Sequence, residues 1–323
     1  MSVITVTNVS KRFNLEAGFF AKFGRFVYAA SDVSFSIGKN ESYGLVGESG
    51  CGKTTTARLL VRMYESDGGA IVFNDAIDVR RLKFTGLKEY REKVKYVFQD
   101  PARSLNPRMT IYETLVSGYR FSSRWPGRKR ARIEAAAILE EVGLSEADLE
   151  RRPAEFSGGQ RQRISIARGL LMEPELLICD EVVSALDVSI QGQILNLLMD
   201  IKSRRSLSFL FIAHDLKVAS YFCDRIGVMY RGELMEEAPA ENLHFNAWHP
   251  YTKLLFSAAS RGPLDGAKAA AGPAPRGEVK SAATRIVGCA FAGRCPMAED
   301  RCLHERPAMR ETGGGGCARC HRV

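Results

Sequence analysis

The stretch Gly47–Thr54, GESGCGKT, is the strongest indication of the fold in this chain. It matches the pattern Gly-x-x-x-x-Gly-Lys-Ser/Thr, and it lies between a predicted strand, Tyr43–Val46, and a predicted helix, Thr55–Met63. Glycines allow such a loop to curl so that consecutive backbone N–H groups at the helix start face one anion. We expect Lys53 to contact the β- and γ-phosphates of a nucleotide and the Thr54 hydroxyl to ligate Mg²⁺. The predicted nucleotide contacts are Gly47, Glu48, Ser49, Gly50, Cys51, Gly52, Lys53, Thr54 and Thr55.

Two carboxylates follow the apolar run Leu176–Cys179, which predicts a buried strand. We expect Asp180 to hold Mg²⁺ through water and Glu181 to polarise an attacking water molecule as a general base. Many strands end in acidic residues, so the pair alone is weak evidence for a catalytic or metal-binding role. Together with the phosphate-binding loop it predicts phosphoryl transfer, which needs both a phosphate cradle and a metal carboxylate.

A second predicted phosphate-binding helix end is Phe156–Gln160, FSGGQ, which precedes the helical run Arg161–Met172. Ser157 is a natural N-cap, and the two glycines after it leave backbone N–H groups open to an anion. A single nucleotide is not expected to contact both helix ends of the same chain. The pattern therefore predicts a dimer in which each chain contacts the nucleotide of the other through Ser157, Gly158, Gly159 and Gln160.

The spacing of the apolar residues predicts two kinds of sheet. Val3–Val9 and Ser31–Ile37 alternate apolar and polar residues, as antiparallel strands with one solvated face do, and the first is expected at a sheet edge. Between them, Phe13–Tyr28 is expected to form a loop or hairpin. From Glu41 onward short apolar runs alternate with helical patterns, which indicates a parallel sheet covered on both faces. These runs are Tyr43–Val46, Val94–Phe98, Leu176–Cys179 and Phe209–Ala213.

Helical periodicity dominates residues 103–172 and predicts a helical insertion between strands of the sheet. The clearest helix is Ala131–Val142, with Gly143 as its C-terminal cap. The segment 261–284 is rich in Ala, Gly and Pro and predicts a linker. The predicted domains are therefore a large one at 1–260 and a cysteine-rich extension at 285–323.

Composition and charge restrict the possible locations and partners. No apolar run approaches the roughly 18 residues needed to span a bilayer, and the N-terminus does not read as a signal peptide. The chain is therefore expected in the cytosol, with membrane association only through a partner. The net charge of +9 is densest at Arg120–Arg132, which fits a solvated helix face or proximity to phosphates or lipid headgroups. No nucleic-acid partner is expected.

Over about residues 3–260 these motifs resemble the nucleotide-binding subunits of ABC transporters. FSGGQ stands where that family has Leu-Ser-Gly-Gly-Gln, so Phe156 is an apolar replacement. The resemblance implies an α/β P-loop NTPase fold of the ABC type, with an N-terminal antiparallel β subdomain, a helical subdomain and a small cysteine-rich C-terminal extension. It also implies an adenine-stacking aromatic, a Q-loop, a D-loop and a switch histidine, at Phe13, Gln99, Ser184 with Asp187, and His214.

The charge and length of their side chains suggest roles for these additional residues. Gln99 is expected to ligate Mg²⁺ and sense the γ-phosphate while its loop contacts a membrane partner. His214 is expected to hold the γ-phosphate and the catalytic water in a closed dimer, and Asp187 to couple the two sites across the dimer seam. Closure around ATP and reopening after hydrolysis would then drive the membrane subunits between states.

Five cysteines crowd the C-terminal segment. In a reducing compartment such a cluster indicates a metal site more than a disulfide framework. With the upstream segment His249–Phe256, it resembles the C-terminal extension of oligopeptide and dipeptide importer ATPases, some of which carry a four-iron cluster. Zinc and metal-free thiols are the alternatives, and Cys317 is the alternative fourth ligand. The predicted cluster ligands are Cys289, Cys295, Cys302 and Cys320.

The resemblance implies an ATP-hydrolysing subunit of an importer of di- or oligopeptides, using ATP and Mg²⁺ at the cytoplasmic face of the bacterial inner membrane. The expected partners are a second ATPase subunit, identical or a paralogue, two transmembrane permease subunits and an extracytoplasmic solute-binding protein. Importers of nickel chelates or opine-like solutes use similar ATPases. Another alternative is a soluble ABC ATPase of translation or DNA repair, but such proteins usually carry two signature domains or a long coiled coil.

Overall fold

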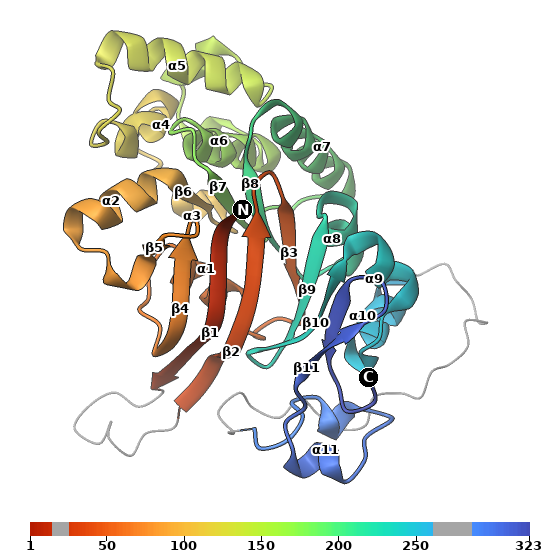
Figure 1. The fold of residues 1–323 in the computed structure, drawn as a ribbon. Helices are drawn as coiled ribbons and strands as arrows, with labels where there is room; N and C mark the ends of the chain where they lie inside the picture. Colours follow the sequence, from red (N-terminus) through yellow and green to blue (C-terminus); the bar gives the residue numbers. More distant parts are fainter. Residues whose placement is uncertain (15–25, 261–285) are drawn as a thin grey trace.

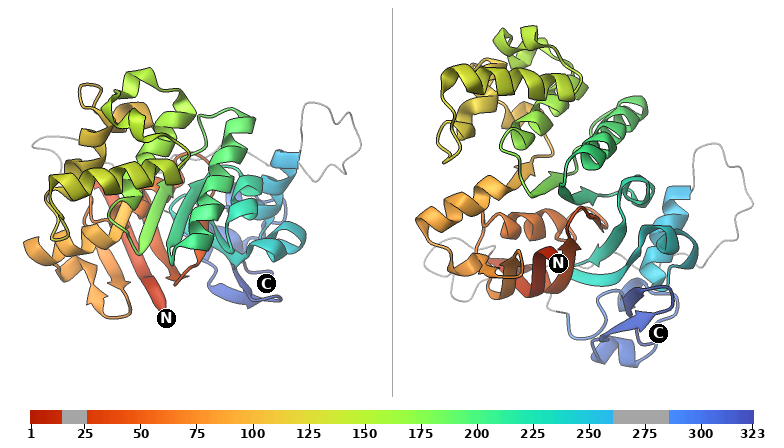
Figure 2. Two further views of the ribbon diagram at one scale, coloured as in Figure 1. Left: turned by 90° about the horizontal axis from the view of Figure 1, so that it is seen from above. Right: turned by 45° about the horizontal axis from the view of Figure 1, so that its top comes forward.

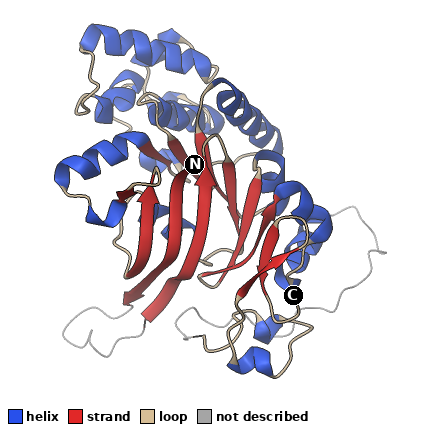
Figure 3. Ribbon diagram, in the orientation of Figure 1, coloured by secondary structure: helices blue, strands red, loops and turns tan. Residues whose placement is uncertain are grey.

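The structure is a computed structural model that describes residues 1–14, 26–260 and 286–323 (Figure 1). Strands fill the middle of the molecule, and helices lie mainly along its outside (Figure 3). The predicted linker, 261–284, and most of the predicted loop Phe13–Tyr28 lie outside the described residues. Within the described ranges, no helix is both long enough and apolar enough to cross a membrane.

The smaller sheet is antiparallel and has the strand order β2-β1-β4-β5. In β2, the side chains of Val33, Phe35 and Ile37 are buried and alternate with less buried ones, as predicted. The prediction that Val3–Val9 is an edge strand is wrong, because β1 pairs with β2 on one side and with β4 on the other. The strands are β1 (Ser2–Asn14), β2 (Phe26–Gly38), β4 (Gly68–Phe73) and β5 (Ile77–Asp78).

The larger sheet has the strand order β11-β12-β10-β9-β3-β8-β7-β6. Strands β9, β3, β8, β7 and β6 run parallel, and every residue of β3, β7 and β8 is buried, as expected for strands covered on both faces. The strands are β3 (Ser42–Val46), β6 (Val94–Val97), β7 (Leu176–Asp180), β8 (Ser208–Ala213), β9 (Arg225–Tyr230), β10 (Glu233–Pro239), β11 (Met309–Thr312) and β12 (Gly316–Arg319).

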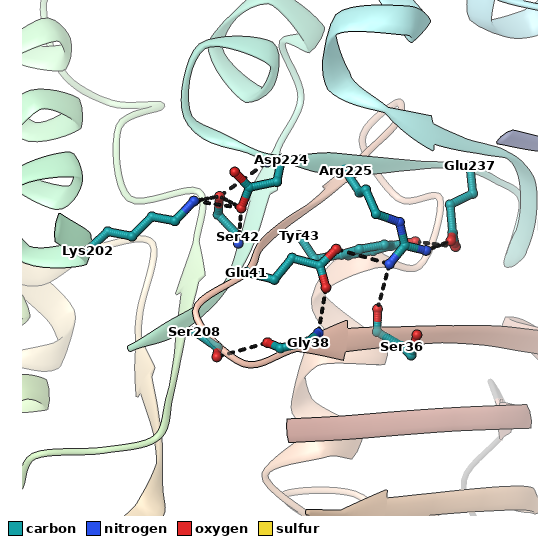
Figure 4. A network of polar contacts seen from close by, with 10 residues as sticks. All are labelled: Ser36, Gly38, Glu41, Ser42, Tyr43, Lys202, Ser208, Asp224, Arg225 and Glu237. Carbon is teal, nitrogen blue, oxygen red and sulfur yellow. Dashed lines mark hydrogen bonds and ion pairs between the residues drawn. The ribbon is translucent and has the colours of Figure 1, made fainter. Parts of the chain in front are cut away.

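A polar network joins the two sheets near the start of β3 (Figure 4). Arg225 lies between two carboxylates: it is 3.0 Å from Glu41 and forms an ion pair with Glu237. It also donates a hydrogen bond to the carbonyl oxygen of Ser36 in β2. The Tyr43 hydroxyl donates to Glu237 at 2.8 Å. Burial raises the pKa of Glu237, so these contacts compensate a carboxylate taken out of water.

Three helices, α4, α5 and α6, gather at one end of the molecule, away from the antiparallel sheet (Figures 1 and 2). They lie in the chain between β6 and β7, where the sequence predicts a helical insertion. Gly143 follows α5 with a φ of 76°, the left-handed conformation expected of its capping role. The helices of this region are α3 (Pro101–Ser104), α4 (Ile111–Tyr119), α5 (Arg128–Glu141) and α6 (Gly158–Leu170).

The C-terminal tail continues the larger sheet, because β12 pairs with β10. Phe291 of the tail is buried against Tyr230 and Tyr251, with ring centroids 5.4 and 5.3 Å away. The main body thus supplies the apolar contacts that the tail's own composition lacks. The remaining helices are α1 (Lys53–Leu60), α2 (Phe84–Lys93), α7 (Val188–Arg204), α8 (Leu216–Phe222), α9 (Ala240–Asn246), α10 (Pro250–Ser260) and α11 (Arg301–His304).

Candidate functional site

The strand order brings four loops to one edge of the larger sheet. Strands β3, β8, β7 and β6 are parallel neighbours in that order, so their carboxyl ends meet at the same edge. The phosphate-binding loop follows β3, His214 follows β8, Glu181 follows β7, and Gln99 lies just beyond β6. Residues far apart in the sequence therefore converge on one region.

The phosphate-binding loop approaches its neighbours so closely that two positions require glycine. A Cβ atom on Gly47 would lie 2.2 Å from a carbonyl oxygen of β9, and one on Gly52 would lie 2.0 Å from a carbonyl oxygen of β2. The Lys53 ammonium group donates to the carbonyl oxygens of Gly47 and Glu48, at 2.7 and 3.1 Å. The loop thus curls around Lys53, the first residue of α1. A lysine at a helix start inside such a curl suits an anionic phosphate chain.

Two of the three residues predicted to hold magnesium, Thr54 and Asp180, are in direct contact. Thr54 Oγ1 donates a hydrogen bond to Asp180 Oδ1 at 3.0 Å, and Asp180 is only 2% exposed. The Tyr96 hydroxyl of β6 donates to the other carboxylate oxygen at 2.5 Å. Hydroxyl and carboxylate oxygens are the hard ligands that Mg²⁺ prefers. The donor atoms present therefore fit the predicted ion.

Glu181 is at the centre of the site. Its φ of 49° is uncommon for a residue with a side chain, and such strained positions cluster at functional sites. Its carboxylate accepts a hydrogen bond from Gln99 Nε2 at 2.8 Å and lies 4.0 Å from Lys53 Nζ. Its carbonyl oxygen accepts from the backbone N–H and the hydroxyl of Ser184, at 3.1 and 2.9 Å. The predicted base is therefore tied to the Q-loop, the phosphate-binding loop and the D-loop.

His214 and Asp187 are both exposed. His214 directly follows β8, and the carbonyl oxygen of Ile212 in β8 accepts the backbone N–H of Glu181 at 3.1 Å. This places the histidine beside the turn that carries the predicted base. Asp187 is exposed immediately before α7.

The predicted signature turn caps α6. Ser157 Oγ accepts the Gln160 backbone N–H at 3.3 Å, and Gln160 Oε1 accepts the Ser157 backbone N–H at 2.9 Å. Both side chains are exposed. Phe156 is buried, and the Arg151 guanidinium lies 4.4 Å from the centre of its ring. The apolar replacement at Phe156 therefore packs inward, while the polar tip of the helix faces outward.

Phe13 lies near the end of β1, opposite Val27 of β2. Its ring packs edge-on against Tyr64, with centroids 5.1 Å apart, and Lys11 Nζ lies 5.4 Å from the ring centre. Stacking of this ring on adenine stays a prediction.

Four tail cysteines, Cys289, Cys295, Cys302 and Cys320, line one cavity of about 20 Å³. Such a volume holds about one water molecule. In the described ranges, no group of three or more His, Cys, Asp or Glu side chains is arranged to hold a metal ion. Cys317 lies on β12, opposite Glu237. The donor atoms suit an iron–sulfur cluster, but this arrangement leaves no room for four irons.

Three contacts of the site were not predicted from the sequence. One is the hydrogen bond from Tyr96 to Asp180. The other two involve Glu48: its N–H donates to the Tyr251 hydroxyl at 3.0 Å, and its carboxylate lies 2.9 Å from Arg294. The position of Tyr96 in the strand before Gln99 was a usable signal. The contacts to Glu48 depend on how the C-terminal part folds back.

Two family models match the chain. The one described as ABC transporter matches residues 30–184, and the one described as oligopeptide/dipeptide transporter, C-terminal region, matches residues 235–302. The second match begins well before residue 285, the predicted start of the extension, and it includes most of β10 and all of α10.

Similar proteins and solved structures agree with these matches. The oligopeptide transport ATP-binding protein AppF of Bacillus subtilis is 40% identical over 321 residues, covering 99% of this chain and 97% of AppF. OppF of the same organism, also named an oligopeptide transport ATP-binding protein, is 49% identical over 232 residues, covering 72% of this chain and 76% of OppF. The dimeric ATP-binding cassette MJ0796, solved with ADP and Pi, has a TM-score of 0.64 and 27% identity, covering 73% of this chain and 98% of the cassette. The chain therefore belongs to the ATP-binding proteins of ABC transporters, within the group that carries the oligopeptide/dipeptide transporter C-terminal region.

Proposed function

We propose that this chain hydrolyses ATP to energise an importer that takes up di- or oligopeptides across the cytoplasmic membrane. The observation that carries the proposal is the convergence of Lys53, Thr54, Asp180, Gln99 and Glu181 at one edge of the sheet. The peptide cargo rests on the similarity to AppF and OppF, which are named for oligopeptide transport.

The proposed roles follow from the contacts. Lys53 and the backbone N–H groups at the start of α1 bind the phosphates of ATP. Thr54, Asp180 and Gln99 hold Mg²⁺, which when bound supplies positive charge beside the β- and γ-phosphates. Glu181 takes a proton from the attacking water, and Gln99 orients its carboxylate by the 2.8 Å hydrogen bond. His214 holds the γ-phosphate when the site closes.

A second ATPase subunit completes each site in this proposal. The Ser157 turn at the start of α6 directs exposed polar groups outward, and a helix N-terminus favours anions. Contact with the nucleotide of a second chain would use these groups, with Asp187 at the seam between the two chains. The second chain is either a copy of this one or a paralogue.

The membrane partners in this proposal are two permease subunits, served by an extracytoplasmic solute-binding protein, and the chain acts at the cytoplasmic face of the bacterial inner membrane. A cavity of about 610 Å³ supports permease contact near Gln99. It lies between β6 and the helices α4 and α6, and its lining includes Gln99, Asp100, Arg103 and Tyr119. A permease segment seated there would move with the loop that carries Gln99.

The four-iron cluster at the tail cysteines also stays a proposal. It would require the lining of the cavity to open, because a volume of about 20 Å³ is too small for four irons. Anaerobic purification followed by iron, zinc and sulfide analysis tests it. Iron and sulfide together with visible absorbance support the cluster, whereas zinc or metal-free protein contradicts it.

The experiment that tests the proposed function uses the chain purified with its membrane subunits in lipid. ATP hydrolysis should rise when the solute-binding protein is added together with oligopeptide, and the Glu181→Gln variant should show no such rise. Stimulation by nickel chelates or opine-like solutes instead of peptides would overturn the cargo assignment. Hydrolysis that no membrane subunit or solute influences would overturn the transport function.

A further inference from the structure

The second residue of the phosphate-binding loop, Glu48, is held by the C-terminal part of the protein. Its backbone N–H donates to the Tyr251 hydroxyl of α10 at 3.0 Å. Its two carboxylate oxygens accept from Arg294 Nη1 at 3.0 and 2.9 Å. Both side chains of this ion pair are shielded, with 12% exposure for Arg294 and 31% for Glu48. The contact spans 246 residues of sequence.

Glu48 also holds the lysine that the site depends on. Its carbonyl oxygen accepts a hydrogen bond from Lys53 Nζ at 3.1 Å. Glu48 therefore makes three contacts. Its carboxylate accepts from an arginine, its N–H donates to a tyrosine, and its carbonyl oxygen accepts from the lysine. A shift of Glu48 would move one of the two carbonyl groups that bind the Lys53 ammonium in this structure.

Arg294 is itself held firmly. It closes the 3-10 turn Ala292–Arg294 and donates to the Tyr230 hydroxyl at 3.4 Å. Its guanidinium lies 5.7 Å from the centre of the Tyr230 ring and 5.9 Å from that of Phe291. Phe291 is 1% exposed and packs on Tyr251 as well, so the arginine and the tyrosine that hold Glu48 share one aromatic cluster.

The charge of Glu48 requires a partner at this place. A carboxylate within the loop that binds a polyphosphate would repel the ligand, and a partly buried site screens that repulsion poorly. Arg294 neutralises this charge through a charge-assisted contact to both oxygens. Without it, the unpaired carboxylate would both repel phosphate and free the loop to move.

We propose that Arg294 is a positioning residue for nucleotide binding: through Glu48 it fixes the backbone that anchors Lys53 and neutralises the one acidic side chain of the phosphate-binding loop. The tail is thus part of the ATP site of this chain. This inference rests on the proposed function of the loop itself.

The test measures the dissociation constant for ATP with Mg²⁺ in the full-length chain. Arg294→Met keeps a long side chain against the aromatic rings but removes the charge. It should raise the dissociation constant about tenfold, which is the effect of losing one charge-assisted hydrogen bond. Arg310→Met is the matched control, since Arg310 is an exposed tail arginine that donates to the carbonyl oxygen of Val323. It should leave the constant within about twofold.

A double variant separates positioning from a general loosening of the tail. In a Glu48→Gln background no carboxylate needs neutralising, so adding Arg294→Met should weaken ATP binding by less than about twofold. If Arg294→Met instead weakens binding equally in both backgrounds, or leaves it at the wild-type value, the proposal is overturned.

A second single variant covers the case in which Arg294→Met does not fold. Tyr251→Phe keeps the ring but removes the acceptor of the Glu48 N–H, and it should raise the dissociation constant about threefold or more. An unchanged constant would then overturn the proposal. Lys53→Ala identifies the source of any failure: if wild-type protein binds ATP and Lys53→Ala does not, the proposed function holds even where this inference fails. Wild-type protein that binds no ATP would overturn both.

Discussion

The side-chain amide of Gln99 donates a hydrogen bond to the carboxylate of Glu181, with 2.8 Å between Nε2 and Oε2. These residues follow two neighbouring parallel strands, β6 and β7, and are separated by 82 residues of sequence. The contact links the loop that borders the cavity near α4 with the residue that we propose activates water. A movement of that loop would therefore change the orientation of the carboxylate, which is a direct route between a membrane partner and the chemical step.

Glu181→Gln should abolish hydrolysis while ATP binding persists. The amide has nearly the same shape but cannot accept a proton, so the rate of phosphate release should fall about 100-fold or more. ATP should then accumulate in a stable dimer, which size-exclusion chromatography with ATP and Mg²⁺ detects. Rapid turnover in this variant would refute the general-base role.

Lys53→Ala should lose most of its nucleotide affinity. The lysine is 4% exposed, and its ammonium group is the positive charge at the centre of the loop. Equilibrium binding of a fluorescent ATP analogue measures the loss. Lys93→Ala is the matched control, because Lys93 is an exposed lysine in an ion pair with Glu175. Equal affinity in the two variants would contradict the loop assignment.

His249 should make the stability of the protein fall as the pH is lowered. Burial lowers its pKa from 6.5 to about 3, so the unfolded chain binds a proton in this range that the folded chain does not. The free energy of unfolding should therefore decrease below about pH 6.5, by at most about 1.4 kcal/mol per pH unit from this group.

Denaturant titrations at pH 7 and pH 5 measure this effect. His249→Asn keeps an acceptor for the Tyr251 N–H, which bonds to His249 Nδ1 at 3.1 Å, but it has no group that titrates. The variant should lose about 2 kcal/mol less than the wild type between the two pH values. An identical pH dependence in the two proteins would show that His249 is not held neutral by burial.

Arg225→Met should destabilise the junction between the two sheets. It leaves Glu41 and Glu237 without their shared cation, and Glu237 is the more buried of the two. Because Arg225 is partly exposed, we expect the free energy of unfolding to fall by about 2–3 kcal/mol rather than by the full cost of a buried pair. Urea titration at pH 7 measures the change. Arg81→Met, at an exposed ion pair with Asp78, should stay within about 0.5 kcal/mol of the wild type.

Local patterns predicted the central part of the fold. The runs in β3, β7 and β8 are continuous and apolar because both faces of each strand are covered, and such runs are visible without any knowledge of partners. The loop after β3 and the acidic pair after β7 were also predictable from local sequence, because each motif lies within a few consecutive residues.

Long-range pairing was not predictable from these patterns. The alternation in Val3–Val9 indicates a strand with one buried face, but it does not show that β4, more than sixty residues away, pairs along its second side. The contact of Arg294 with Glu48 is similar, because nothing within either segment identifies the other. The predicted cysteine ligands have the right donor atoms, yet the space between them depends on packing that spacing does not encode.

In the proposed dimer, one ATP lies between the loop Gly47–Thr54 of one ATPase subunit and the Ser157 turn of another. A photo-activated cross-linker at the exposed position Gln160 tests it directly, in the Glu181→Gln variant assembled with its partner subunits and loaded with ATP. Isotope labelling of one ATPase subunit distinguishes links between subunits from links within one. We expect ATP-dependent cross-links from Gln160 to the phosphate-binding loop of the other ATPase subunit. Cross-links that never reach that loop in any ATP-loaded state would contradict this arrangement of the two subunits.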